Sequence, residues 1–310
     1  MKALVYVERS DVRGGIEVFA ERQVAEMRAK GREVVVARSR EEAAAGLADC
    51  DEAIVHKCGD VATLEMFPPE KTTLYVHDHD PVCPRSYAYT PLGRNCSRPG
   101  GLWPCLFCAP LCRGWKAALG RVFSQRRRLA AMARMKRIVV ISEFMKSRLV
   151  VNGIDPGKIA VEPPRIEIGQ AASAPVGDVD LLFVGQLVRG KGVGLLLRAM
   201  ALMKAPRTLD IVGAGNMEPK LRALTARLGL GERVRFRGFK PNPLDWMRAA
   251  ACVVVPSFWQ EPYGLVAAEA VALGRPVVAF ATGGLPEACG GHATLVKPGD
   301  VAALASALER

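Results

Sequence analysis

The chain has 310 residues, of which 50% are hydrophobic and 24% charged, and its formal net charge is +12. This composition is typical of a globular protein with room for two domains, and it argues against long disordered regions. The absence of an 18-residue apolar run argues against a transmembrane helix, and the short N-terminal apolar run argues against a secretory signal. We therefore expect a cytoplasmic protein.

The first half of the chain alternates short apolar strands with helices. A strand at residues 3–7 leads through a loop with Gly14 and Gly15 into a helix over 17–29. Further strands are expected at residues 33–37, 52–58, 73–78 and 137–142. Because these apolar runs are continuous rather than alternating, the strands are expected to be buried on both faces of a parallel sheet.

The strand over 73–78 runs into the polar stretch His77-Asp78-His79-Asp80. Residues of these types could hold a metal, as an Asp-x-Asp pair does, or act in catalysis without one. They could equally form a polar turn without a chemical role. For His79 and Asp80 the favoured interpretation is a solvated turn.

Five of the nine cysteines fall within one segment of 30 residues, at Cys83, Cys96, Cys105, Cys108 and Cys112. The Cys-x2-Cys pair with a cysteine nearby is compatible with a structural zinc or an iron–sulfur cluster. The alternative is a thiol-rich insertion without metal. The order of the spacings does not support a radical enzyme of the S-adenosylmethionine type.

The positive charge is concentrated between residues 111 and 148, where eleven Lys or Arg residues face one acid, Glu143. Such a segment fits an anionic membrane surface, a phosphate-bearing substrate or nucleic acid, or it is a solvated helix face. The apolar residues of the preceding loop, Trp103, Leu106 and Phe107, could add a membrane contact or cover a lipid-linked acceptor.

A proline-containing segment at residues 160–180 is predicted to link two domains. After it, strands are expected at 180–185, 208–215, 233–239, 251–257, 275–280 and 293–298. Helices are expected between them at 192–204, 217–229, 243–250 and 263–274. Strand-to-helix units of this size are typical of βαβ crossovers, so a second doubly wound domain is predicted, with a ligand cleft between the two domains.

Two glutamates flank the start of the helix at 263–274, Glu261 before it and Glu269 within it. The backbone N–H groups of Gly264 and Leu265 and the positive end of the helix dipole are suited to a phosphate. Carboxylates would repel phosphate but accept hydrogen bonds from sugar hydroxyls. One ligand satisfies both, a nucleotide sugar with its donor sugar on Glu261, its diphosphate on the helix and its ribose on Glu269.

The segment "EPYGLVAAE", followed by "GRPVVAFATGGLPE", resembles the E-x7-E donor site of family-4 glycosyltransferases, which are retaining enzymes with the GT-B fold. "FVGQLVRGKG" resembles the family's phosphate loop, with Lys191 at the lysine position, Gln186 where arginine is common, and Arg189 as a replacement charge. The resemblance implies donor binding by Gly14, Gly15, Gly185, Arg189, Lys191, Gly213, Gly215, Gly238, Phe239, Tyr263, Gly264, Leu265 and Glu269.

In the first domain, His77-Asp78 with Cys83-Pro84-Arg85 resembles the family's His-Asp motif, which faces the donor sugar. The resemblance implies that His77, Asp78 and Glu261 are the catalytic residues, with His77 stabilising the sugar and the departing phosphate taking the acceptor's proton. Two other nucleotide-binding motifs are disfavoured. Gly192 stands where a P-loop needs Ser or Thr, and "GAGNME" lacks the third glycine of a dinucleotide motif.

The sequence therefore predicts an α/β protein of the GT-B type, with two doubly wound Rossmann-like domains facing a central cleft. The domains are an acceptor-side domain at 1–165 with a cysteine-rich insertion at 83–112, and a nucleotide-sugar domain at 178–310. The predicted function is retaining, metal-independent transfer from a nucleoside-diphosphate sugar to a glycan or lipid-linked acceptor in cell-surface glycan or glycolipid synthesis, with no cofactor needed for catalysis.

Two alternatives are a metal–thiolate regulatory protein on a degenerate transferase scaffold, and a metal-dependent transferase that uses Asp78 and Asp80. The expected location is cytoplasmic, with contact to the inner face of a membrane, and nucleic acid is not favoured as a partner. Family members usually continue beyond the last helix and cross back onto the first domain, whereas this chain stops at "VAALASALER". A truncated form, or domain closure held in another way, is expected from that difference.

Overall fold

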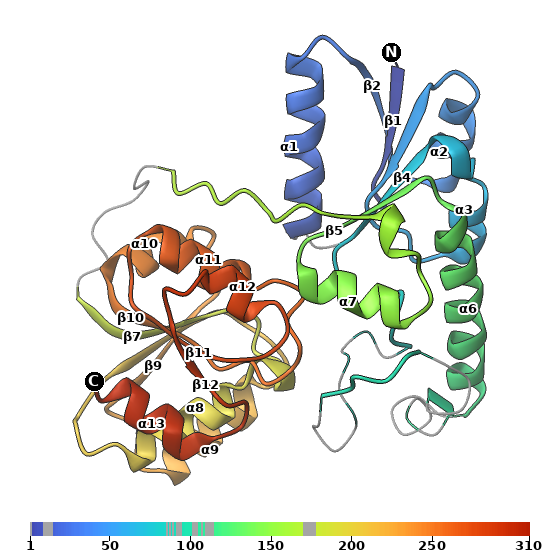
Figure 1. Ribbon diagram of the computed structural model, residues 1–310. Coiled ribbons are helices and arrows are strands. Elements are labelled where there is room, and N and C mark those ends of the chain that lie inside the picture. The colour runs from blue at the N-terminus through green and yellow to red at the C-terminus, as the bar shows by residue number, and fades with distance from the viewer. Residues whose placement is uncertain are drawn as a thin grey trace. The chain divides into compact units, whose positions relative to one another are not determined.

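The computed structural model describes residues 2–8, 15–84, 86, 88, 90, 95–100, 105–106, 108, 115–169 and 178–310, and at residues 15 and 115–118 only the backbone. The chain divides into two compact units, Met1–Pro164 and Arg165–Arg310, called unit 1 and unit 2. Each unit is built on a parallel sheet of six strands within the described residues (Figure 1).

Unit 1 alternates strands and helices along the chain. Its described elements are β1 Lys2–Tyr6, α1 Gly15–Ala29, β2 Glu33–Ala37, α2 Arg40–Leu47, β3 Glu52–Val55, α3 Val61–Glu65, a 3₁₀ turn at Pro69–Lys71, β4 Thr72–Val76, α6 Trp115–Arg134, β5 Arg137–Val140, α7 Glu143–Val151, a second 3₁₀ turn at Pro156–Lys158, and β6 Ile159–Val161.

The sheet of unit 1 has the strand order β2-β1-β3-β4-β5-β6. In its register Val55 pairs with Leu74 and Val76 with Val140, so the carboxyl ends of β3, β4 and β5 lie at one edge. Helix α1 packs on one face through Ala20, Val24 and Met27, which join strand residues in a buried apolar cluster. Side chains that follow these strands are therefore held close together by a rigid scaffold.

Unit 2 repeats the alternation. Its described elements are β7 Val179–Val184, a 3₁₀ turn at Arg189–Lys191, α8 Val193–Leu202, β8 Leu209–Val212, α9 Glu218–Arg227, β9 Val234–Gly238, α10 Pro243–Ala249, β10 Ala250–Val255, α11 Leu265–Ala272, β11 Val277–Phe280, α12 Leu285–Cys289, β12 Thr294–Val296 and α13 Val301–Leu308. The strand order is β12-β11-β10-β7-β8-β9, so the chain reverses direction across the sheet between β7 and β10.

Helices cover both faces of the unit 2 sheet. On one face lie α8, α9 and α13 (Figure 1), and their side chains form a buried cluster with strand residues such as Phe183 and Phe280. On the other face, Met247, Ala267 and Leu285 bring α10, α11 and α12 onto the sheet. Burial of both faces explains why the strands are continuous apolar runs.

The predicted strands of both halves and the two parallel α/β domains are confirmed. The prediction of a linker over the whole of residues 160–180 was wrong at its ends. Residues 159–161 form β6, which pairs with β5 at the edge of the unit 1 sheet, and β7 begins at Val179. The three-residue strand was missed because Pro163 and Pro164 begin one residue after its end, and prolines are typical of loops.

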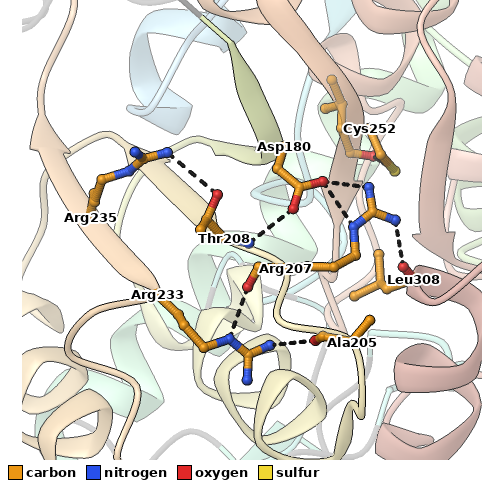
Figure 2. Close-up of polar contacts among 9 residues, drawn as sticks. Asp180, Ala205, Arg207, Thr208, Arg233, Arg235, Cys252 and Leu308 are labelled. Carbon is orange, nitrogen blue, oxygen red and sulfur yellow. Dashed lines mark hydrogen bonds and ion pairs between the residues drawn. The ribbon is translucent and has the colours of Figure 1, made fainter.

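The amino ends of β7, β8 and β9 are joined by a polar cluster centred on Arg207 (Figure 2). Both the Nε and Nη2 groups of Arg207 donate to Asp180 Oδ1, at 2.8 and 2.5 Å, and Nη1 donates to the carbonyl of Leu308 at 2.8 Å. Asp180 Oδ2 also accepts from the backbone N–H of Thr208 at 2.9 Å. Arg233 in turn donates to the carbonyls of Arg207 and Ala205. The cluster ties the end of α13 to β7.

Replacing Asp180 by alanine is expected to lower the free energy of unfolding of unit 2 by about 2 kcal/mol, because the half-buried Arg207 and the Thr208 N–H lose their acceptor. Chemical denaturation of the full chain measures this change. Asp178→Ala, at an exposed aspartate two positions earlier, is the matched control. Equal stabilities of the two variants would contradict the role of the cluster.

Candidate functional site

The loops that follow β7 and β10 meet where the order of the unit 2 strands reverses, the usual place for a ligand in an open α/β sheet. The backbone N–H of Phe258 donates to the carbonyl of Gly190 at 3.1 Å. Gly192 has φ +73°, and a Cβ there would lie 1.8 Å from the carbonyl oxygen of Pro256. Only glycine fits this contact, so the two loops are joined backbone to backbone.

Glu261 stands in the middle of this junction, only 6% exposed. Its Oε1 atom accepts hydrogen bonds from Lys191 Nζ at 2.7 Å, Ser257 Oγ at 2.6 Å and Trp259 Nε1 at 2.7 Å. Lys191 Nζ also lies 5.3 Å from the ring centre of Trp259. The phosphate-loop lysine and the glutamate predicted to bind the sugar, 70 residues apart, are thus brought into one ion pair.

The charge of Glu261 is set by two opposing effects. Burial by itself would raise the pKa of this carboxyl, but the charge of Lys191 and the three hydrogen bonds outweigh it and lower the pKa below its ordinary value. Glu261 is therefore an ionised, hydrogen-bond-accepting group at neutral pH. Such a group can bind hydroxyls and repels a phosphate placed against it.

Helix α11 begins as predicted, directly after Gly264. Gly264 has φ +114°, and its carbonyl accepts from the N–H groups of Ala267 and Ala268. Leu265 is exposed at the first helical position, and Glu269 is half-buried one turn further on. Burial raises the pKa of Tyr263, with a further contribution from Glu287. The predicted diphosphate-binding residues thus surround a helix start.

The other predicted donor-binding residues lie along the same edge of the sheet. Gly185, Gly213 and Gly238 end or directly follow β7, β8 and β9, and Gly215 lies two residues beyond Gly213. Arg189 is exposed in the 3₁₀ turn before Lys191, and Phe239 is 74% exposed after β9. Of the two predicted glycine-loop residues in unit 1, Gly15 begins α1 and Gly14 lies outside the described residues.

In unit 1, His77 and Asp78 directly follow β4 and are both half-buried. They line a small hollow with Lys57, Asp80 and Arg128, among others. His77 Nε2 lies 3.2 Å from Nδ1 of His56, which directly follows the neighbouring strand β3. The ring of Phe19 from α1 meets the His77 ring edge-on, with 5.3 Å between ring centres. The sheet, not the loop, therefore fixes the place of His77.

Burial changes the ionisation of these groups. It lowers the pKa of His77 to about 4, although Glu17 acts in the opposite direction, and it lowers the pKa of His56 to about 3 with help from His77. Burial, together with the charge of Asp80, raises the pKa of Asp78 to about 6. At neutral pH both histidines are therefore uncharged and Asp78 is ionised.

These shifts predict a loss of stability in acid. Between pH 6.5 and about 4 the unfolded chain binds protons at His56 and His77 that the folded chain does not, so each histidine lowers the free energy of unfolding by about 1.4 kcal/mol per pH unit. Asp78 acts in the opposite sense between about pH 6 and 4, because the folded chain binds its proton first. The histidine contribution is the larger.

Replacing His56 by glutamine should therefore reduce the slope of stability against pH by about 1.4 kcal/mol per unit over this window. Chemical denaturation at several pH values between 7 and 4 measures it, with His292→Gln, at an exposed histidine, as the control. A His56→Gln slope equal to that of the unchanged chain would contradict the assignment.

Sequence reasoning missed His56 and Gln23, and it was wrong about His79. His56 Nε2 lies 2.8 Å from Gln23 Oε1 of α1. His56 could have been found, because it follows a strand just as His77 does and parallel strands end at one edge. His79 is not solvated but buried, with its ring edge-on to Phe144. Asp80 does form a turn, in which its N–H donates to Asp78 Oδ1 at 3.0 Å.

The cysteines predicted as metal ligands are half-buried and not in disulfides where they are described, at Cys83, Cys96, Cys105 and Cys108. Cys112 lies outside the described residues, as do Trp103 and Phe107. Within the described part of the chain, no three His, Cys, Asp or Glu side chains are grouped closely enough to hold a metal ion. No helix in that part combines the length and apolar character needed to cross a bilayer.

Residues 178–310 match the family described as glycosyl transferases group 1. Among curated proteins, the chain is 35% identical over 149 residues to an uncharacterized glycosyltransferase of Methanocaldococcus jannaschii, covering 46% of this chain and 38% of that protein. It is also 35% identical over 191 residues to a D-inositol 3-phosphate glycosyltransferase of Streptomyces bingchenggensis, covering 53% of this chain and 42% of that protein. The matches thus span about two fifths of these relatives.

Solved structures resemble the whole chain. Anabaena HepE in complex with UDP-glucose matches with a TM-score of 0.71 at 18% identity, over 100% of this chain and 89% of that one. WaaG, a glycosyltransferase involved in lipopolysaccharide biosynthesis, matches with a TM-score of 0.66 at 17% identity, over 99% and 90%. At this identity the likeness concerns the fold. The chain therefore has the GT-B fold, and its residues 178–310 match the group 1 glycosyl transferase family.

Proposed function

We propose that this protein transfers a sugar from a nucleoside-diphosphate sugar to an acceptor hydroxyl, with retention of the anomeric configuration and without a catalytic metal. The observation that carries the proposal is the ion pair of the half-buried Lys191 with the buried Glu261, at the point where the unit 2 strand order reverses. The match of the same unit to group 1 glycosyl transferases supports it, and so does the fold shared with a protein solved in complex with UDP-glucose.

In unit 2 the parts of the donor are assigned by charge. Glu261 is ionised, and its Oε1 is already used by three donors, so we assign its second oxygen to hydroxyls of the transferred sugar. Lys191 and the exposed Arg189 bind the diphosphate together with the N–H groups of Gly264 and Leu265. Glu269 binds the ribose. Gly213, Gly215, Gly238 and Phe239 serve the nucleoside.

The reaction then depends on stabilising the leaving group. As the bond from the sugar to the diphosphate breaks, negative charge grows on the phosphate oxygen, and Lys191 with the start of α11 stabilises it. The acceptor hydroxyl attacks from the face that the diphosphate leaves, and its proton passes to a phosphate oxygen. In unit 1, His77 is proposed to hydrogen-bond the transferred sugar and Asp78 to orient it or the acceptor.

Incubating the full chain with UDP-, GDP-, ADP- and dTDP-sugars, with and without EDTA, tests the proposal. A productive donor is expected to raise the melting temperature of the protein, because it binds the native state only. Its sugar is expected to be released by hydrolysis or transferred with retention of the anomeric configuration, and NMR of the product measures that configuration. Transfer that EDTA abolishes would instead favour the metal-dependent alternative with Asp78 and Asp80. No binding of any donor would overturn the proposal.

Metal analysis of the purified chain tests for zinc or an iron–sulfur cluster at the cysteines.

We also propose that the acceptor is a glycan or lipid-linked molecule of cell-surface glycan synthesis, reached from an anionic membrane surface. One face of α6 supports this, because Leu119 and Phe123, the latter 56% exposed, lie along it with arginines that could contact lipid headgroups. Of the exposed arginines of this helix, Arg126 and Arg127 lie three and four positions after Phe123, on the same face, and Arg127 also pairs with Glu65. Co-sedimentation with phosphatidylglycerol vesicles but not with phosphatidylcholine vesicles is expected, and equal behaviour with both would contradict it.

A further inference from the structure

A continuous chain of hydrogen bonds runs behind His77 in unit 1. From His77 Nε2 it passes to His56 Nδ1 at 3.2 Å, and from His56 Nε2 to Gln23 Oε1 at 2.8 Å. Gln23 Nε2 donates to the hydroxyl of Tyr75 at 2.7 Å, and that hydroxyl donates to Glu162 Oε2 at 3.3 Å. This chain of hydrogen bonds joins the ends of β3, β4 and β6 to helix α1.

The end at Glu162 determines the direction in which every donor points. Arg137 donates to Oε1 of this carboxylate at 2.6 Å, so both oxygens of the carboxylate have a donor beside them. An ionised carboxylate can only accept hydrogen bonds, so the Tyr75 hydroxyl must donate to it. The Tyr75 oxygen therefore accepts from Gln23, and the side-chain amide of Gln23 has to present its nitrogen to Tyr75 and its oxygen to His56.

The direction then carries over to the two imidazoles. Because Gln23 Oε1 is an acceptor, His56 Nε2 must carry a proton. An uncharged imidazole has one protonated nitrogen, so His56 Nδ1 is an acceptor, and the proton between the rings belongs to His77 Nε2. His77 Nδ1 is left without a proton. The lowered pKa values of His56 and His77, about 3 and 4, agree with two uncharged rings, and burial raises the pKa of Tyr75 to about 12, which keeps its hydroxyl proton.

Packing holds the rings in this arrangement. The ring centres of His56 and Tyr75 lie 4.7 Å apart and those of His56 and His77 5.4 Å apart, in stacked pairs. Phe19 meets both histidine rings edge-on, at 5.7 and 5.3 Å. Rotation of an imidazole by half a turn would exchange its nitrogens with carbons and would break the chain within this stack.

We propose that Gln23 and His56 are positioning residues that hold His77 in its Nε2–H tautomer, so that Nδ1 presents a hydrogen-bond acceptor to a hydroxyl of the donor sugar. The part that concerns the sugar rests on the proposed function, whereas the tautomer is a property of the protein alone. The tautomer of His77 is set by Glu162, three hydrogen bonds beyond the His56–His77 pair. Because an acceptor at Nδ1 binds a hydroxyl proton, this arrangement selects for hydroxyl-bearing ligands.

Nuclear magnetic resonance of the full chain with ¹⁵N-labelled histidine tests the tautomer directly. The chain has four histidines, so each can be assigned by replacement with glutamine. In long-range ¹H–¹⁵N spectra at pH 7.5, His77 is expected to show a protonated Nε2 and an unprotonated Nδ1. His56 is expected to show the same pattern, with its Nε2 protonated toward Gln23. A protonated Nδ1 on His77 would overturn the proposal.

Two variants at the Glu162 end of the hydrogen-bond chain separate the effect of hydrogen-bond direction from the effect of the Arg137–Glu162 ion pair. Glu162→Gln replaces the obligate acceptor by an amide that can donate to Tyr75, so the direction can reverse and a mixture of His77 tautomers is expected. Arg137→Met breaks the same ion pair but leaves the carboxylate, so the single tautomer should remain. Tyr75→Phe should also give a mixture and provides a second variant if Glu162→Gln does not fold. A single unchanged tautomer in both Glu162→Gln and Tyr75→Phe would overturn the proposal.

Activity supplies the second readout. Gln23→Met keeps the length of the side chain but removes its hydrogen bonds, and transfer is expected to fall roughly tenfold, the lower end of the cost of removing the partner behind a functional imidazole. Transfer at the unchanged rate together with a mixed tautomer would overturn the positioning role. If the tautomer is found as expected but no nucleotide sugar is bound, the proposed function fails and the assignment of the tautomer stands.

Discussion

Replacing Glu261 by alanine is expected to lower kcat/KM for sugar transfer by about 1,000-fold, or about 4 kcal/mol of transition-state stabilisation. Two losses add up in this variant. The sugar hydroxyls lose their ionised acceptor, and Lys191 loses the carboxylate that holds it 2.7 Å away, so the cation is no longer fixed for the diphosphate. Kinetics with the donor found in the nucleotide-sugar screen measures the change.

Two further variants make this result interpretable. Glu261→Gln keeps the volume and an acceptor oxygen for Ser257 and Trp259, so it should fold normally and still lose most of its activity, because the negative charge is gone. Glu232→Ala, at an exposed glutamate of the same unit, should leave activity unchanged. If Glu261→Ala keeps an activity within tenfold of that of the unchanged chain, the assignment of the donor site is wrong.

Replacing Gly213 by alanine is expected to lower the free energy of unfolding of unit 2 by about 3 kcal/mol, a fall of roughly 10 °C in melting temperature. Gly213 has φ +144°, and a Cβ would lie 1.9 Å from the carbonyl oxygen of Gly185. Its own N–H donates to Gly238 at 2.8 Å, so the residue cannot move away without loss of that bond. Thermal unfolding of the full chain checks the result.

Gly231→Ala is the matched control for Gly213→Ala. A Cβ at Gly231 meets no atom within 4 Å, and its φ lies outside the positive range that L residues avoid. This substitution should change stability by less than about 0.5 kcal/mol, as exposed positions usually do. Similar melting temperatures for the two variants would show that the loops after β7 and β8 can separate at little cost.

The contact at Gly213 also changes the interpretation of the glycines in the sequence. Gly185, Gly213 and Gly215 of "FVGQLVRGKG" and "IVGAG" were predicted to bind the donor. The structure adds a second reason for glycine in these segments, because Gly192 and Gly213 let neighbouring loops of the sheet touch, at Pro256 and Gly185. Close packing of loops and close packing of a ligand both require a missing Cβ, and sequence alone does not distinguish them.

The sequence by itself determined the fold and the parts of the candidate donor site that lie close together in the chain. Continuous apolar runs mark buried strands locally, and the glutamate, glycine and helix start at residues 261–265 are one local segment, so burial and helix-end chemistry were enough to predict them. The tertiary structure alone decided the pairings. Lys191 and Glu261 are 70 residues apart, and Gln23, Tyr75, His56 and His77 meet only because parallel strands end at one edge beneath α1. A side chain's protonation and tautomer depend on what burial and packing place beside it, and that is a property of the folded sheet.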